Sequence, residues 1–466
     1  MPGCEVSRGE VAHGTTVWQD ACDYAPRAVR VPFAADRGRA HCVRSSVHTP
    51  RARAFRHRRG RVPGLPKAYG DDASLLPRLS TDLTYTSLDA PGSGEAQAHV
   101  TWDDAWFTAS DTAYNHELAQ TSSVLAALAY SESGYYQSKT SQPAYMENAL
   151  SALGFDDACT ASYRYRSEVL DEVLNLVTDD ADGVAYTVAR KRLKLDDEGQ
   201  GAPRDLILVS VRGSYGSEWL SNLDLTSDES NDHGGYCRAA QEICEKLGTW
   251  VDESVADGAN VSVLLVGHSR GGAVANLVAA EIDDCRAGVQ PVAVQDPGQA
   301  DDLSALGTVD HLYAYTFASP ATTLSTQARS ARYDNIFNIA NPSDIMPYLP
   351  LSSWGYERYG VDMELPSVDT AGFDAACEDM RALYEQSVGV ACGADPSDKH
   401  VVQAVLGDVA TGIGSVEELV TPRGALAVFT SVAARVDPVR ILYSHYPSTY
   451  IAWMSVIAED GLTVVK

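Results

Sequence analysis

The sequence predicts an α/β fold in which a mostly parallel central sheet is covered by helices on both faces. Short apolar segments that are typical of buried strands alternate along the chain with segments that repeat apolar residues at helical spacing. One of these apolar segments leads into the letters GHSRG at Gly267–Gly271, and a run rich in small residues follows it. The chain contains no internal repeats.

The composition is that of a globular protein. The chain has 466 residues, of which 45% are hydrophobic, so one large domain or two to three ordinary domains have enough apolar material for a core. The formal net charge is −27. Because nucleic acids and anionic membrane surfaces are also negatively charged, this balance argues against both as partners.

No run of apolar residues is long enough for a transmembrane helix, so we expect no integral membrane segment. The first thirty residues lack the basic and then apolar layout of a secretory signal, and we therefore expect a cytoplasmic protein. The nine cysteines are scattered and form no Cys-x-x-Cys pair. They predict neither a zinc site nor a disulfide framework.

Residues 1–67 differ in composition from the rest of the chain. They hold twelve arginines and one lysine against five acidic residues, with many Gly and Pro and no apolar periodicity. We expect this basic N-terminal extension to be disordered. The alternative is a basic arm for nucleic acid or lipid headgroups, centred on Arg51–Gly64.

The predicted α/β domain covers residues 100–466. Apolar residues at helical spacing predict helices within Asn115–Ser133, Met146–Phe155 and His233–Val255. Further helical patterns at Asp374–Val388 and Ala404–Val420 predict a helical insertion or cap over residues 360–435. The predicted strands are an edge hairpin strand at Gly183–Leu193 and buried strands within Asp205–Ser214, Val261–Ser269, His311–Pro320 and Tyr333–Asp344.

Ser269 has the surroundings of a nucleophile. The pattern Gly-x-Ser-x-Gly after a strand and before a helix is typical of a nucleophile elbow, in which the serine lies in a strained turn. Gly267 and Gly271 remove the Cβ atoms that would otherwise collide with the strand and the helix. In an open α/β sheet, this turn lies beyond the carboxyl ends of the strands, where reactive groups gather.

A serine hydroxyl needs a histidine base, and that base needs a carboxylate to fix its tautomer. In this fold the chain order is Ser, then acid, then His. His445 follows an apolar segment and suits a loop after a last strand, His400 opens a helical run and remains the alternative, and His311 begins a strand at the wrong end of the sheet. Asp344 and Asp296 both follow apolar runs and are both candidates for the acid.

The site must also stabilise an oxyanion with backbone N–H groups. The N–H of Arg270, directly after the nucleophile, is one expected donor. The second is expected from the loop that follows the strand Asp205–Ser214, where Ser214 offers its backbone N–H.

Several segments together resemble the fungal-type class 3 lipases of the α/β-hydrolase superfamily. The segments are RGSYGSEWLSNL, HGGYCRAA, VLLVGHSRGGAVANLVA, YTFASPA, NPSDIMPYLPLSSWGYERYG and HYPSTYIAWM, and they extend from about Asp104 to Tyr450. The resemblance implies an ester or lipid substrate, the triad Ser269, Asp344 and His445, and an oxyanion hole of Ser214 and Arg270. It implies no metal or organic cofactor.

The sequence departs from this family in two places. Arg270 stands where a large apolar residue is usual, which puts a purely triglyceride-like substrate in doubt. The stretch between Asp344 and His445 is longer than usual. The segment Tyr215–Asp232, which corresponds by position to a lid, is rich in Asp, Ser and Asn and does not form an evidently lipid-seeking helix.

The sequence therefore predicts a serine hydrolase that cleaves carboxylic esters of lipids. A phospholipase, a thioesterase or an acyltransferase on the same fold is the alternative. A non-catalytic interaction protein built on a hydrolase scaffold is the third hypothesis. Oligomeric state and acyl-chain length leave no signature in the sequence.

Overall fold

A computed structural model describes residues 78–87, 94–138, 144–161, 185–195, 201–213, 234–289, 303–419, 421–435 and 438–465. The predicted N-terminal extension, residues 1–67, lies outside these ranges. The first strand that the structure describes is β1 (Leu79–Thr86), which forms an antiparallel hairpin with β2 (Glu95–Trp102). The packed domain therefore begins before residue 100, the start we expected, because Leu83, Tyr85 and Ala98 of the hairpin are buried in the core.

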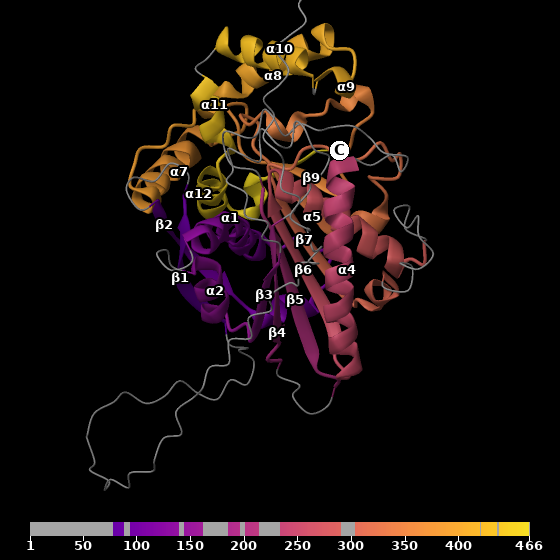
Figure 1. The fold of residues 1–466 in the computed structure, drawn as a ribbon. Coiled ribbons are helices and arrows are strands. Elements are labelled where there is room, and N and C mark those ends of the chain that lie inside the picture. Colours follow the sequence, from indigo (N-terminus) through magenta and orange to yellow (C-terminus); the bar gives the residue numbers. More distant parts are fainter. Residues whose placement is uncertain are drawn as a thin grey trace, which may run out of the picture. The chain divides into compact units, whose positions relative to one another are not determined.

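The central sheet of the described chain has eight strands, and its middle is parallel (Figure 1). The pairs from β5 through β9 are parallel, and the two ends of the sheet are antiparallel. In spatial order the strands are β10 (Thr463–Val465), β9 (Val361–Glu364), β8 (Ile336–Ala340), β7 (His311–Phe317), β6 (Asn260–His268), β5 (Arg204–Val211), β4 (Tyr186–Arg192) and β3 (Asp157–Ala161).

The predicted edge strand is not at the edge. β4 pairs with β5 as a hairpin partner, as expected, but its other side is covered by β3. The sequence before residue 183 carries too little apolar alternation to signal β3, whose five residues are DACTA.

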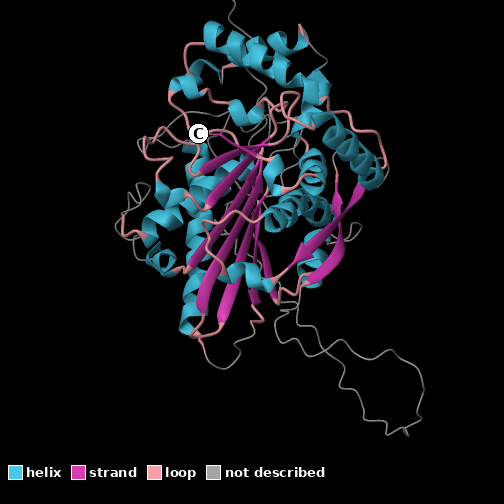
Figure 2. Cartoon of the chain, turned by 180° about the vertical axis from the view of Figure 1, so that it is seen from behind, coloured by secondary structure: helices cyan, strands magenta, loops and turns pink. Residues whose placement is uncertain are grey.

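Helices cover both faces of the sheet (Figure 2). Their bounds are α1 (His116–Ser138), α2 (Tyr145–Ala152), α4 (Gly234–Ala256), α5 (Arg270–Arg286), α7 (Phe373–Val388), α8 (Lys399–Gly412), α9 (Val416–Leu419), α10 (Pro422–Ala433), α11 (Pro438–His445) and α12 (Pro447–Val456). Short 3₁₀ turns lie at Asp104–Thr108, Ser304–Thr308, Ala331–Tyr333, Met346–Tyr348, Ser352–Trp354, Pro396–Asp398 and Glu459–Gly461.

The two faces of the sheet have separate cores, because successive side chains of a strand point to opposite sides. Leu206 and Leu208 of β5 face the core that α1, α7 and α12 share with the β1–β2 hairpin. Ile207 and Val209 face the core formed with α4 and α5. The sheet is thus buried on both faces, which explains the continuous apolar strands of the sequence.

The predicted insertion at residues 360–435 is too wide, because β9 belongs to the central sheet and α7 packs into the same core as α1 and α12. The rest of this range, α8 to α10, is the helical insertion, and it forms a third core next to the carboxyl ends of the parallel strands. Apolar residues of α8, α9 and α10 pack against Ile345, Met346 and Leu349, which come directly after Asp344. Both views show these helices beyond that end of the sheet (Figures 1 and 2). Within the described residues, no helix is long and apolar enough to cross a membrane.

Candidate active site

Ser269 lies in a strained turn between β6 and α5. Its backbone has φ 56° and ψ −129°, a conformation with positive φ that side-chain-bearing residues rarely adopt. Its N–H donates a hydrogen bond of 2.9 Å to the carbonyl of Phe317 at the end of β7. A Cβ atom at Gly267 would overlap the carbonyl of Gly271, and one at Gly271 would overlap the carbonyl of Val211. The two glycines therefore let β6 turn sharply into α5.

His445 points its imidazole at Ser269. The His445 Nε2 lies 2.9 Å from the Ser269 Oγ. We expected His445 in a loop after a last strand, and this was wrong, because Pro438–His445 is the helix α11. The buried residues Ile441 and Ser444 stand three apart, which is helical spacing, and Pro438 fits the first turn of a helix.

Asp344 is fully buried behind His445. Its Oδ2 lies 2.8 Å from the His445 Nδ1, and its Oδ1 accepts a 2.9 Å hydrogen bond from the N–H of Met346. The turn after β8 carries Asp344, whose own N–H donates to the carbonyl of Asn341 at 2.9 Å. The other candidate acid, Asp296, lies outside the described residues.

Neither of the other two histidine candidates has a described hydrogen bond to Ser269. His311 begins β7, at the opposite end of the sheet from Ser269, and its Nδ1 lies 4.0 Å from Asp111. His400 is an exposed residue in the first turn of α8.

The expected oxyanion hole is described only in part. Arg270 is the first residue of α5, where backbone N–H groups have no partner within the helix. Ser214 and the lid segment Tyr215–Asp232 lie outside the described residues. Gly213, the residue before Ser214, is packed so closely that a Cβ atom there would overlap the Tyr130 hydroxyl and the His268 carbonyl.

Tyr450 is a member of the site that the sequence analysis missed. Its hydroxyl donates to the Asp344 Oδ2 at 2.9 Å and accepts from the N–H of Asn341 at 3.0 Å. Burial, together with the neighbouring carboxylate, raises the pKa of Tyr450 well above its usual value, so the hydroxyl keeps its proton. Tyr450 lies five residues after His445, in the segment HYPSTYIAWM of the resemblance, but nothing in that segment indicates that its hydroxyl contacts Asp344.

His268 is the second residue that the sequence analysis left without a role. Its Nε2 lies 2.8 Å from the backbone carbonyl of His445, and its Nδ1 lies 2.9 Å from the Tyr130 hydroxyl. Because a carbonyl only accepts, the Nε2 carries the proton and the Nδ1 accepts from Tyr130. Burial, and then the neighbouring His445, lower the pKa of His268 well below its usual value, so the ring is neutral. A polar residue next to the nucleophile in an apolar strand was the available signal.

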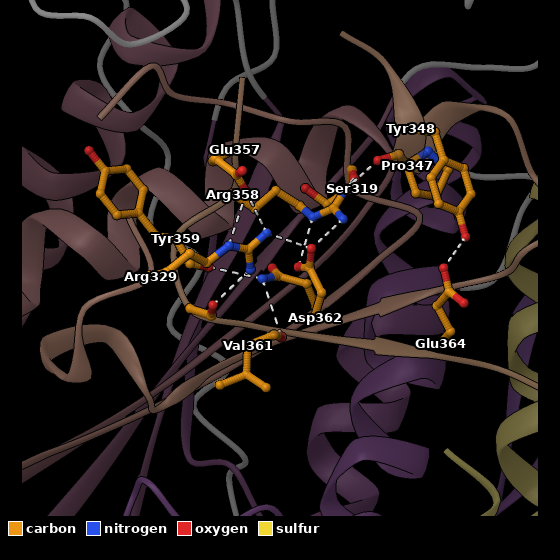
Figure 3. A network of polar contacts seen from close by, with 12 residues as sticks. Ser319, Arg329, Pro347, Tyr348, Glu357, Arg358, Tyr359, Val361, Asp362 and Glu364 are labelled. Carbon is orange, nitrogen blue, oxygen red and sulfur yellow. Dashed lines mark hydrogen bonds and ion pairs between the residues drawn. The ribbon is translucent and has the colours of Figure 1, made fainter. Parts of the chain in front are cut away.

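A buried ion pair supports the loops around the site (Figure 3). The Arg358 guanidinium contacts both carboxylate oxygens of Asp362 in β9, at 3.0 and 2.7 Å. It also donates to the carbonyl of Ser319, after β7, at 2.9 Å and to the carbonyl of Pro347, after Asp344. One arginine thereby joins the two loops that follow β7 and β8.

Hydrogen bonds also connect the turn before α8 to the segments that carry Asp344 and His445. The Ser343 Oγ donates to the carbonyl of Pro396 at 2.8 Å, and the Arg440 Nε of α11 donates to the Asp398 Oδ2 at 2.8 Å. The turn Pro396–Asp398 thus contacts both the residue before Asp344 and the helix that ends in His445. Within the described ranges, no group of three or more side chains gathers that could hold a metal ion.

The family model described as Lipase (class 3) matches residues 208–354. Solved structures with similarity to the chain include fungal lipases. A Rhizomucor miehei lipase–propeptide complex is 17% identical with a TM-score of 0.34, over 54% of this chain and 70% of that one. Lipase II of Rhizopus niveus is 19% identical with a TM-score of 0.27, over 40% and 63%. A lipase of Rhizopus microsporus var. chinensis is 17% identical with a TM-score of 0.34, over 63% and 85%.

The matched segment contains β6, the elbow at Ser269, β7, β8 and Asp344. The parallel sheet with helices on both faces and the serine at the carboxyl end of a central strand are the α/β-hydrolase arrangement. The chain therefore has an α/β-hydrolase fold, and its residues 208–354 match the family model of the class 3 lipases.

Proposed function

We propose that the protein hydrolyses lipid esters of the acylglycerol type through an acyl-enzyme on Ser269, with His445 as base and Asp344 as its carboxylate. The observation that carries the proposal is the hydrogen-bond chain from the Asp344 Oδ2 to the His445 Nδ1 at 2.8 Å and from the His445 Nε2 to the Ser269 Oγ at 2.9 Å. Nucleophile, base and orienting acid stand in the order that serine acyl transfer requires.

In the first step the Ser269 Oγ attacks the ester carbonyl carbon while the His445 Nε2 takes the hydroxyl proton. Asp344 accepts the Nδ1–H and stabilises the imidazolium that forms. When the tetrahedral intermediate collapses, the Nε2–H protonates the leaving alkoxide oxygen. Water then attacks the acyl-enzyme, with His445 again acting first as base and then as acid, and releases the carboxylic acid.

Backbone N–H groups stabilise the oxyanion of each tetrahedral intermediate. The proposed donors are Arg270, at the N-terminus of α5, and Ser214. The positive end of the α5 dipole favours the same negative charge.

Hydrolysis of p-nitrophenyl and acylglycerol esters by the purified chain tests this proposal. We expect Ser269→Ala to lower kcat by about 10⁴-fold or more, because the nucleophile is lost. Ser262→Ala is the matched control, since Ser262 is a fully buried serine of β6, seven residues before Ser269. Hydrolysis that survives in Ser269→Ala would refute the assignment.

Arg270 favours one second candidate, a phospholipase. Arg270 is half-buried and stands directly after Ser269, at the start of α5, in a protein with an excess of acidic residues. A cation next to the nucleophile suits an ester that carries a phosphate. Under this candidate, Arg270→Met lowers kcat/KM for phospholipids about tenfold and leaves neutral diacylglycerol turnover unchanged. If Arg270→Met changed kcat/KM equally for both substrates, the phospholipase candidate would be rejected and the acylglycerol esterase would remain.

A further inference from the structure

The C-terminal end of α11, which carries His445, is held by side chains of three other segments. Helix ends leave their last carbonyl groups without partners in the helix. Here three consecutive carbonyls each accept a side-chain hydrogen bond: Tyr443 from the Thr449 Oγ1 at 2.6 Å, Ser444 from the Asn341 Nδ2 at 2.9 Å, and His445 from the His268 Nε2 at 2.8 Å.

All three donors are buried, with exposed fractions of 0% for Thr449, 3% for Asn341 and 2% for His268. Water therefore does not replace them easily, and each hydrogen bond fixes the backbone at a defined point. We call His268, Asn341 and Thr449 the carbonyl clamp.

Each clamp residue is adjacent to a member of the site. His268 is the residue before Ser269. Asn341 accepts the Asp344 N–H on its carbonyl at 2.9 Å, and Thr449 precedes Tyr450, whose hydroxyl contacts Asp344. The clamp thus ties the backbone of the base to the segments of the nucleophile and of the acid.

His268 has the most direct connection. Its imidazole bonds the carbonyl of His445 itself, and the two rings lie 4.9 Å apart between centroids. The Tyr130 hydroxyl of α1 bonds the opposite ring nitrogen at 2.9 Å, so the neutral His268 ring is fixed on both sides.

We propose that the carbonyl clamp positions His445, so that His268, Asn341 and Thr449 are positioning residues of the hydrolase reaction. The inference rests on the proposed function, since it assigns these residues to the base His445. A small shift of a catalytic group lowers the rate of the chemical step much more than substrate binding. Loss of a clamp hydrogen bond therefore lowers kcat and leaves KM nearly unchanged.

The direct test is Thr449→Val in the full chain, because valine keeps the shape of threonine and removes the hydroxyl. Thr121→Val is the matched control. Thr121 is also fully buried, and its Oγ1 donates to the Thr101 carbonyl at 2.7 Å, between α1 and β2 and away from His445. We expect Thr449→Val to lower kcat for a p-nitrophenyl ester by about tenfold with KM within about twofold of wild type.

The conservative variant and the control complete the measurement. Thr449→Ser restores the hydroxyl and is expected to return kcat to within about twofold of wild type. Thr121→Val is expected to lower Tm as much as Thr449→Val without changing kcat. Equal kcat values for Thr449→Val and Thr121→Val would overturn the proposal.

A second pair of variants covers the case in which Thr449→Val does not fold. His268→Gln keeps an amide N–H donor near the position of the Nε2, and His268→Phe removes it. The proposal expects the glutamine variant to retain more kcat than the phenylalanine variant, and the reverse order contradicts it.

A readout independent of turnover separates this inference from the proposed function. The proton between the His445 Nδ1 and Asp344 gives a low-field NMR resonance, which Asp344→Asn identifies by removing it. The clamp predicts that this resonance broadens in Thr449→Val and stays sharp in Thr121→Val. If Ser269→Ala still hydrolyses esters, the function fails; if Ser269→Ala is inactive and the resonance is unchanged in Thr449→Val, only the clamp fails.

Discussion

Tyr450 and His445 donate hydrogen bonds to the same carboxylate oxygen, the Oδ2 of Asp344, at 2.9 and 2.8 Å. Asp344 is fully buried, so these donors and the N–H of Met346 replace the water that a carboxylate would otherwise bind. The geometry of the acid therefore depends on a residue outside the Ser-His-Asp chain.

Tyr450→Phe is expected to reduce activity without abolishing it. The change removes one of two donors to the Oδ2 of Asp344, and we expect kcat to fall about tenfold and the free energy of unfolding to fall by about 1–2 kcal/mol. The matched control is Tyr313→Phe, which removes a buried hydroxyl that donates to the Ala109 carbonyl at 2.6 Å, far from Ser269. Ester kinetics and urea unfolding of both variants check this; equal kcat in the two would contradict the role of Tyr450.

Gly213→Ala is expected to damage both activity and folding. A Cβ atom there overlaps the Tyr130 hydroxyl and the His268 carbonyl and approaches the Ser269 Cβ to 3.2 Å, so the strand end or the nucleophile turn must shift. We expect a loss of about 1–3 kcal/mol in unfolding free energy and a lower kcat. Gly201→Ala is the control, since no atom lies within 4 Å of its added Cβ. Wild-type kcat in Gly213→Ala would show that the packing tolerates the change.

Gly407→Ala is expected to stabilise the insertion. Gly407 lies inside α8, is exposed, and has no atom within 4 Å of an added Cβ. Alanine in a helix interior is better than glycine by about 0.5–1 kcal/mol, so Tm should rise while kcat stays constant. A fall in Tm would indicate that α8 is not helical at this position.

Asp283 makes stability depend on pH. Burial, only partly opposed by Arg286 and Asn335, raises the pKa of Asp283 from 3.8 to about 7. Because the folded-state pKa lies above the unfolded value, the protonated form stabilises the fold; this contribution is complete below about pH 4 and is lost as the pH rises through about 7.

Asp283→Asn removes that titration while keeping the oxygen that faces Asn335 at 3.4 Å. The wild-type Tm should fall between about pH 5 and about pH 8 by more than the Tm of Asp283→Asn. The same pH dependence in both proteins would show that Asp283 is not the responsible group.

Arg358→Met is expected to destabilise the fold strongly. The change leaves Asp362 buried with Arg329 as its remaining partner at 2.6 Å and removes the donor to the carbonyls of Ser319 and Pro347 (Figure 3). Breaking such a buried pair costs about 3–5 kcal/mol, which urea unfolding measures. Arg423→Met, at an arginine whose side chain is 86% exposed, should change the unfolding free energy little. Similar small changes in both variants would contradict this.

The sequence predicted those parts of the fold and site that are determined by residues close together in the chain. The apolar strand before Ser269 and the two flanking glycines predicted the elbow, because few conformations fit that combination. The apolar runs of β5, β7 and β8 predicted the parallel sheet, because strands that are buried on both faces are apolar along their whole length. Chain order and position relative to the strands then left His445 and His400 as candidates for the base and Asp344 and Asp296 as candidates for the acid. The resemblance to class 3 lipases implied His445 and Asp344.

The sequence analysis did not predict the roles of Tyr450 and His268, because these roles depend on contacts between segments that are far apart in the chain. Tyr450 meets Asp344 across 106 positions of the chain, and His268 meets His445 across 177. Neither pair leaves a periodic or compositional signal. α11 was taken for a strand because its apolar run is short, and short apolar runs fit both a strand and a buried helix turn.

The central claim is that Ser269, activated by His445, forms the acyl-enzyme. Intact-protein and peptide mass spectrometry after treatment with a fluorophosphonate ester tests it most directly, because the adduct is stable and its position can be read. The account predicts one adduct per chain, on the peptide that contains Ser269, formed in wild type and at least about 10³-fold more slowly in His445→Ala. An adduct on another residue, or unchanged labelling in His445→Ala, would contradict it.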